Sequence, residues 1–362
     1  MKVNDISPYL GYIYVSLAAL AYGISTPFSK VFLDVINPLV LSGWFYLFSG
    51  LSLLWSFPKS LPSNKESLKR KDIKILIPII VSGSILAPFF IFIGLRIIPA
   101  FQASLYLNFE VVFTILVALV IFRDEITKKA ALGIGIVIIV LMFWSINFNV
   151  FRVFEAFNFG ILFILLGCFG YSIDNNLTES LGNKYAPRIT AIKGLFGGLF
   201  SLGLSFFLGY QLIFSIGQFI LIFIIGILSY GISILFFIKS LQLIGTIKTT
   251  TIFSTSPFLG SIFSVLFLSE FFNLIDIIVF FITLIGIYLI LSDKHVHYHS
   301  HGIVLHTHKI ELGDIHHQDI ILAHDKTKVA QDEKIQHIHK PKQHKHSHSH
   351  YSHHAHEDVE EK

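Results

Sequence analysis

Charged and amide side chains occur at only a few points inside the long apolar stretches of this chain. A charge held near the centre of a bilayer costs at least ~2.5 kcal/mol, so such residues are expected to face a water-filled cavity or each other. Glu110 and Asp174 lie deepest, and for them a solute-site or proton-coupling role competes with structural pairing of buried polar groups. The candidates for a polar pathway are Lys30, Gln102, Tyr106, Asn108, Glu110, Tyr171, Asp174, Asn175, Glu179 and Lys193.

Several of these candidates allow more than one interpretation. Lys30 and Glu179 carry opposite charges at matching positions of an internal repeat, so they would either pair, bracket a zwitterionic ligand together, or each extend to the membrane interface from a helix end. Gln102, Tyr106 and Asn108 lie near Glu110. They would either line the same pathway or hydrogen-bond to a neighbouring helix.

A second kind of chemistry is confined to the end of the chain, because all 18 histidines follow Lys294. His-x-His repeats and adjacent pairs offer several imidazoles to one first-row cation, which favours Zn²⁺, Ni²⁺ or Cu²⁺. The alternative is a polycation that gains charge as the pH falls through ~6.5. No cofactor is expected to be required. The candidate metal ligands are His295, His297, His299, His301, His344, His346, His348, His350, His353, His354 and His356.

The composition indicates a membrane protein. Apolar residues make up 53% of the chain and charged residues 14%, against roughly 25% charged in a soluble domain. Stretches of about 20 apolar residues suit helices that cross ~30 Å of hydrocarbon, whereas the strands of membrane barrels are shorter and alternate. We predict an all-α polytopic fold with ten transmembrane helices, near residues 10–29, 37–57, 74–95, 100–122, 129–147, 159–178, 189–208, 218–239, 247–268 and 274–292.

An internal repeat organises these spans. The segment Leu95–Trp144 is echoed by Leu241–Leu289, and Tyr22 precedes Tyr171 by 149 positions. The sequence therefore predicts two five-helix repeats, over residues 1–148 and 149–294, followed by a largely disordered tail over residues 295–362. Because each repeat holds an odd number of spans, the second repeat is inverted, an arrangement that usually places a solute site near the midplane between the halves.

The loop charges predict the orientation. Alternate loops are rich in lysine and arginine, and such loops face the cytoplasm. Both termini, and with them the histidine tail, are therefore expected inside the cell, in an inner or plasma membrane. The residues behind this prediction are Lys59, Lys65, Lys69, Arg70, Lys71, Lys74, Arg123, Lys128, Lys129, Lys184 and Arg188.

Short motifs recur in a fixed order along both halves. AYGISTPFSK ends at Lys30, FRDE ends at Glu125 and FLSE ends at Glu270, with Pro257 standing 13 residues before that glutamate. Over residues 8–292 this ordered set resembles the drug/metabolite transporter superfamily, and within it the EamA-type permeases. The resemblance implies a secondary transporter that moves a small polar organic metabolite by alternating access.

The tail alone suggests an alternative, a divalent metal-ion (Zn, Ni or Co) transporter or a metal-responsive membrane protein. Residues 1–294 argue against metal transport, because they contain no histidine and only one cysteine, Cys168. We therefore expect the tail to regulate or buffer. No nucleotide-binding loop or catalytic triad is found, so an enzyme is not expected. The expected partners are the lipid bilayer, a small solute and divalent metal, with no nucleic acid, in a monomer or homodimer.

Overall fold

The computed structural model describes residues 7–57, 61, 65–122, 127–145, 158–270 and 273–292, together with 296–300, 304–309, 334–339 and 343–347. The chain divides into a helical body and a small unit formed by Lys294–His348, and each is described by itself.

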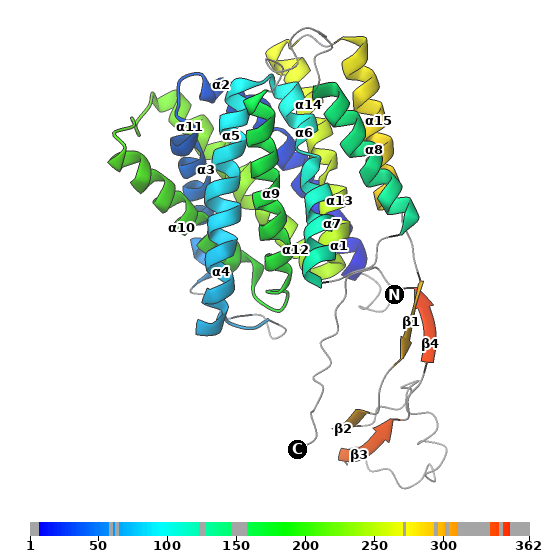
Figure 1. Cartoon of the computed structure of the whole chain (residues 1–362). Helices are drawn as coiled ribbons and strands as arrows, with labels where there is room; N and C mark the ends of the chain where they lie inside the picture. The colour runs from blue at the N-terminus through cyan, green and yellow to red at the C-terminus, as the bar shows by residue number, and fades with distance from the viewer. Residues whose placement is uncertain are drawn as a thin grey trace. The chain divides into compact units, whose positions relative to one another are not determined.

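The body is a bundle of long helices, many of them interrupted (Figure 1). The first half contains α1 (Ser7–Gly23), α2 (Ser25–Leu33), α3 (Pro38–Ser52), α4 (Ile73–Ile80), α5 (Ala87–Ile97), α6 (Ala100–Tyr106), α7 (Phe109–Phe122) and α8 (Lys128–Ser145). The second half contains α9 (Phe159–Glu179), α10 (Ala186–Phe207), α11 (Ile216–Ile225), α12 (Ser233–Ile244), α13 (Thr246–Phe253), α14 (Thr255–Leu268) and α15 (Leu274–Leu291).

Nine segments among the described residues are long and apolar enough to cross a membrane, and the all-α membrane fold is confirmed. The predicted fifth span, 129–147, is helical as α8, but this helix is not among the nine, so the count of ten stays a prediction. The nine segments are Tyr9–Leu33, Pro38–Ser56, Arg70–Ile97, Ala100–Val120, Phe159–Glu179, Ala186–Phe207, Ile216–Ile244, Thr246–Leu268 and Leu274–Leu291.

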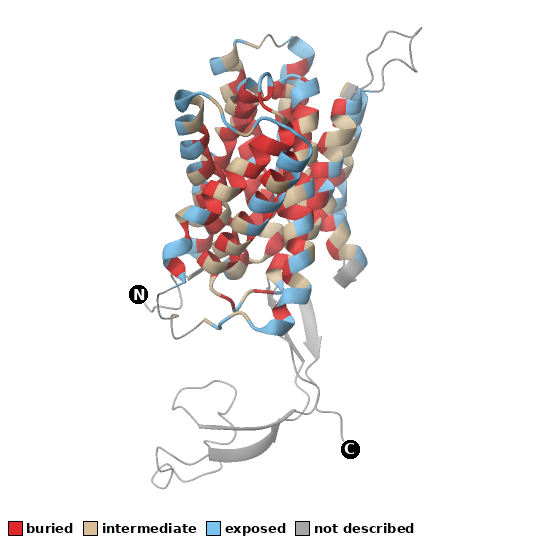
Figure 2. Cartoon of the chain, turned by 90° about the vertical axis from the view of Figure 1, so that its left-hand side faces the viewer, coloured by how far each residue is buried: buried red, intermediate tan, exposed pale blue. Residues whose placement is uncertain are grey.

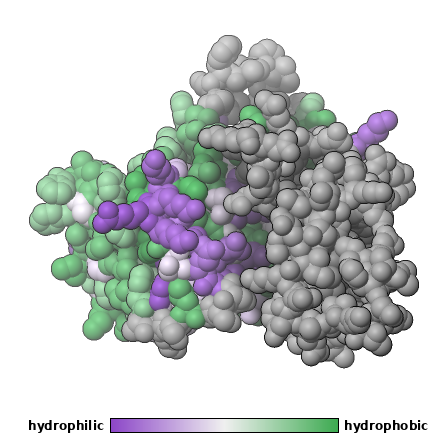
Figure 3. Space-filling model, turned by 90° about the horizontal axis from the view of Figure 1, so that it is seen from below, coloured by the Kyte–Doolittle hydropathy of each residue, from purple (hydrophilic) through white to green (hydrophobic). Residues whose placement is uncertain are grey.

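The outer surface of the bundle is apolar, as lipid contact requires. Val120, Phe207 and Ile216 leave 80%, 86% and 82% of their surface exposed. Figure 2 shows buried residues along the inside of the helices and exposed ones on their outer faces. Hydrophilic residues instead gather at the end of the bundle where α4 begins (Figure 3).

The helix interruptions repeat between the halves. π-helical turns occupy Val81–Leu86, between α4 and α5, and Gly226–Ile232, between α11 and α12, at positions 145 residues apart. The following span is broken in both halves, before Phe109 and at Ser254. Such breaks leave backbone groups for side chains or ligands to satisfy, and π-helical turns are frequent at functional sites.

Prolines mark the places where helices restart. Pro27, Pro88 and Pro257 each lie in the first turn of a helix that follows an interruption, namely α2, α5 and α14. Proline lacks a backbone N–H, and the first turn of a helix has no intrahelical acceptor for that group. These three prolines therefore coincide with helix starts, whereas Pro78 lies inside α4.

The loop before α4 joins the two halves at the lysine-rich end of the bundle. Lys65 Nζ donates to Gly182 O (3.0 Å) and Gln242 Oε1 (2.8 Å), while Lys184 Nζ lies 3.0 Å from Glu66 Oε2 and 3.1 Å from Asp72 Oδ2. The hydrogen bond from Lys184 holds the pKa of Glu66 below its usual value. This contact therefore persists at neutral pH and is lost only as the pH falls through that lowered pKa.

Four short segments of the tail are strands, and the predicted disorder of the tail as a whole stays a prediction. β1 (Val296–Ser300) pairs antiparallel with β4 (Gln343–Ser347), and β2 (Val304–Lys309) pairs antiparallel with β3 (Lys334–His339). Two histidines stand two residues apart in each of these strands, a period of two residues that suits a strand. Composition alone did not reveal this pattern, and the rest of the tail lies outside the described residues.

Helices α3 and α10 cross at small residues. A Cβ added to Gly194 would overlap the backbone of Gly50, and one added to Gly198 would overlap the backbone of Leu47. Gly194 and Gly198 therefore allow the two helices to approach closely. Gly133 likewise packs against Gly286 of α15, whereas Gly135 has nothing within 4 Å of an added Cβ.

We predict that Gly194→Ala lowers the thermal stability of the detergent-solubilised protein, because overpacking a closely packed site costs about 1–3 kcal/mol. Gly203→Ala is the matched control in the same helix, since an added Cβ there meets nothing within 4 Å. That control should be neutral or slightly stabilising. Equal melting temperatures for the two variants would contradict the close crossing.

Candidate functional site

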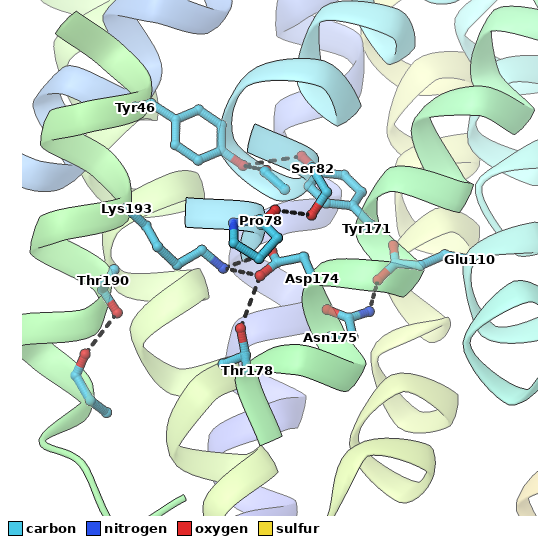
Figure 4. A network of polar contacts seen from close by, with 12 residues as sticks. Tyr46, Pro78, Ser82, Glu110, Tyr171, Asp174, Asn175, Thr178, Thr190 and Lys193 are labelled. Atoms are coloured by element: carbon cyan, nitrogen blue, oxygen red, sulfur yellow. Dashed lines mark hydrogen bonds and ion pairs between the residues drawn. The ribbon is translucent and has the colours of Figure 1, made fainter. Parts of the chain in front are cut away.

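A cavity lies inside the bundle. Its polar wall carries Glu110 from the first half and Asp174, Asn175 and Lys193 from the second. Figure 4 shows Asp174 between Lys193 of α10 on one side and the Glu110–Asn175 pair on the other. Both halves therefore contribute charged groups to one site. The full lining is Tyr22, Tyr46, Glu110, Tyr171, Asp174, Asn175, Thr178, Lys193, Ser233, Ile234, Phe237, Ile238, Leu241 and Phe253.

The strongest interaction in this cavity is the ion pair between Asp174 and Lys193. Lys193 Nζ donates to both Asp174 oxygens, at 2.7 and 2.6 Å, and Thr178 Oγ1 donates to Oδ1 at 2.9 Å. Both ionic side chains are buried, with 7% and 5% of their surface exposed. A buried ion pair persists only when its polar atoms are satisfied, and these three hydrogen bonds supply that.

Space for Asp174 is provided by the first π-helical turn. A Cβ on Gly83 would overlap the Asp174 carboxylate, so this position requires glycine. Tyr46 Oη donates to Gly83 O at 2.7 Å and lies 3.4 Å from Tyr171 Oη. In the second π-helical turn, Ser49 Oγ donates in the same way to Tyr230 O at 3.0 Å. Helix α3 thus supplies a hydroxyl to each turn.

Glu110 stands where the fourth span is broken, in the first turn of α7. Asn175 Nδ2 donates to Glu110 Oε1 at 2.8 Å. Among the described residues, Glu110 has no ion-pair partner. It lies at a helix N-terminus, where the free backbone N–H groups carry partial positive charge.

Lys30 and Glu179 do not pair with each other, nor do they line this cavity. Lys30 Nζ donates to the carbonyls of Leu95 (2.7 Å), Arg96 (3.2 Å) and Ile98 (2.9 Å) at the end of α5. Glu179 accepts from the backbone N and the hydroxyl of Thr246 at the start of α13. Each charge instead satisfies the free backbone groups of a helix end, which the sequence could not reveal.

Three other predicted pathway residues lie outside the cavity lining. Tyr106 is buried, with its hydroxyl 3.2 Å from Leu141 O and its ring stacked on Trp144. Asn108 is also buried, and its Nδ2 donates to Leu105 O at 2.9 Å. Gln102 lies half-buried on α6. For Tyr106 and Asn108 the second interpretation, hydrogen bonding inside the bundle, describes the contacts better.

Sequence reasoning missed Tyr22, Tyr46, Thr178 and Phe253 as lining residues. A signal existed for two of them. Tyr22 matches Tyr171 in the internal repeat, and Thr178 lies one helical turn after Asp174. The role of Glu270 was also missed: its two oxygens accept from the backbone N–H groups of Ala100 and Phe101, both at 2.7 Å, at the start of α6. Glu125 lies outside the described residues.

The predicted metal ligands fall into two groups. His297, His299, His344 and His346 belong to β1 and β4, where His297 is opposite His346 and His299 is opposite His344. The other seven, His295, His301, His348, His350, His353, His354 and His356, lie outside the described residues.

Comparison with known proteins identifies the family. Residues 9–146 and residues 158–292 each match the EamA-like transporter family. The chain belongs to the EamA-like transporter family. The two matched segments fall within the two predicted halves, and together they place the cavity inside an integral membrane transporter.

Relatives of this EamA-like transporter agree with the assignment. An uncharacterized transporter of Methanothermobacter thermautotrophicus is 26% identical over 296 residues, which cover 77% of this chain and 85% of the relative. A crystal structure with 13% sequence identity superposes with a TM-score of 0.56, covering 78% of this chain and 94% of that one, and shows the same fold.

We predict strong coupling between Asp174 and Lys193. Lys193→Met leaves a buried carboxylate without its counter-ion and should cost about 3–5 kcal/mol of unfolding free energy, whereas Asp174→Asn combined with Lys193→Met should cost much less than the sum of the single changes. Equilibrium unfolding in detergent measures the cycle, with the exposed Lys128→Met as control. Additive effects would contradict the pair.

Proposed function

We propose that this protein is a secondary transporter that moves a small polar organic metabolite through the Glu110–Lys193 cavity by alternating access. The observation that carries the proposal is the polar cavity itself. It lies among membrane-crossing helices, and its charged side chains come from both halves. A change in packing between the halves would therefore alter the site and its access together.

Broken helices support this proposal. Glu110 lies directly after the break between α6 and α7, and Phe253 of the lining ends α13 at the matching break of the second half. Discontinuous helices near the midplane are a recurrent way to build solute sites in secondary transporters.

Aromatic rings that lie between two cavities support alternating access. Tyr22 lines both the main cavity and a smaller one that is also lined by Ser25, Ser29 and Tyr230. The Tyr22 and Tyr230 rings lie 5.8 Å apart, and the Tyr22 and Phe253 rings 5.3 Å apart. We propose that these rings separate two access routes that open in turn.

A divalent-metal substrate is less well supported, because the described lining of the cavity offers neither histidine nor cysteine. We propose instead that the tail binds Zn²⁺, Ni²⁺ or Cu²⁺ as a regulator or buffer. The strand register supports this, since it places His297, His299, His344 and His346 at facing positions of one two-stranded sheet. We further propose an inner or plasma membrane location with both termini cytoplasmic.

We predict that a chain ending at Lys294 keeps organic-solute flux near the full-length rate in metal-free buffer but loses most Zn²⁺ or Ni²⁺ binding. The measurement is a solute-flux screen in proteoliposomes, together with metal titration of both purified proteins.

The screen has clear contrary outcomes. A correctly inserted truncated protein that is inactive toward every solute moved by the full-length chain would contradict the role assigned to the tail. Zn²⁺ flux by the full-length protein that disappears on truncation would favour the metal transporter instead. Flux of no organic solute by either protein would reject the transport proposal.

A further inference from the structure

The formal charges around the main cavity do not balance. Its charged lining residues are two carboxylates, Glu110 and Asp174, and one ammonium group, Lys193. Lys193 is held by both oxygens of Asp174, so its charge is compensated within the pair. Glu110 receives a hydrogen bond from the neutral amide of Asn175, and no cation pairs with it among the described residues. With Glu110 ionised, the described lining therefore carries a net negative charge.

This uncompensated carboxylate is accessible from the cavity. Glu110 is only partly buried, unlike Asp174 and Lys193. Figure 4 shows the Glu110 carboxylate directed toward Asn175 and set apart from the Asp174–Lys193 pair. A ligand can thus reach Glu110 without breaking the ion pair.

The rest of the wall is largely aromatic and aliphatic. Tyr22, Tyr46, Tyr171, Phe237 and Phe253 belong to the lining. Aromatic rings attract cations through their quadrupole, and aromatic cages are the usual sites for alkylated ammonium groups. An anion would meet neither this attraction nor an uncompensated cation.

We propose that the cavity binds an organic ammonium ion. Glu110 neutralises the charged group, and the aromatic side chains contact the ammonium and its apolar substituent. A bare inorganic cation fits less well, because such ions require several oxygen ligands, and Ile234, Ile238 and Leu241 occupy much of the remaining wall. The inference rests on the proposed function and narrows its substrate to one chemical class.

Matched probes of nearly equal shape test the charge preference. We would measure binding of 2-phenylethylammonium, 2-phenylethanol and 3-phenylpropanoate to the full-length protein in lipid nanodiscs by calorimetry, with phenylalanine as a zwitterion and NaCl as an inorganic competitor. The ammonium probe should bind at least about tenfold more tightly than the other three, and NaCl should compete weakly.

Two substitutions test whether Glu110 causes the preference for the ammonium probe. Glu110→Gln preserves the shape of the side chain and should weaken ammonium binding about tenfold or more while leaving 2-phenylethanol binding unchanged. That unchanged binding also shows that the variant is folded. Asp34→Asn removes an exposed carboxylate outside the cavity and should have no effect.

Several results would overturn the inference. These are tighter binding of the carboxylate or the zwitterion, unchanged ammonium binding in Glu110→Gln, complete displacement by Na⁺, or binding of none of the probes. Proteoliposome flux of neutral or anionic solutes, with no flux of ammonium ions, would reject this substrate class and leave the transporter proposal standing.

Discussion

An ionised group inside a bilayer must be neutralised by a partner or face water, and this constraint organises the interior of the protein. Asp174 and Lys193 meet the first condition through a bidentate ion pair reinforced by Thr178. Glu110 meets the second by facing the cavity from the start of α7. Gly83 leaves room for the Asp174 carboxylate, because an added Cβ at this position would overlap it.

The same constraint explains the charges at the interrupted helices. A break within a span leaves N–H and C=O groups that water cannot satisfy in hydrocarbon. Lys30 donates to carbonyls at the end of α5, while Glu179 and Glu270 accept N–H groups at the starts of α13 and α6. Glu270 also links the two halves. These charged side chains therefore satisfy the backbone groups that the helix breaks leave free.

The sequence predicts the helical membrane fold and half of the candidate pathway. Long apolar runs identify the helices, and the cost of burying charge points to Glu110, Asp174 and Lys193, which line the cavity together with Tyr171 and Asn175. Lys30 and Glu179 look equivalent to these in sequence. Their partners are backbone groups at helix ends, which no side-chain pattern records. The sequence did not point to Tyr46, because its hydroxyl donates to a carbonyl of a π-helical turn. Such turns leave little trace in the composition.

Passage of a solute through the cavity requires that Asn175, which lines it, be reachable from the aqueous phase. We would measure labelling of Asn175→Cys by a charged, membrane-impermeant thiol reagent in lipid vesicles, in a Cys168→Ala background, with Phe196→Cys as the control. Phe196 lies on α10, as Lys193 does, and leaves 62% of its surface exposed on the apolar exterior. We expect rapid labelling at position 175 and little at position 196. An unreactive cysteine at position 175 that becomes reactive only after denaturation would contradict it.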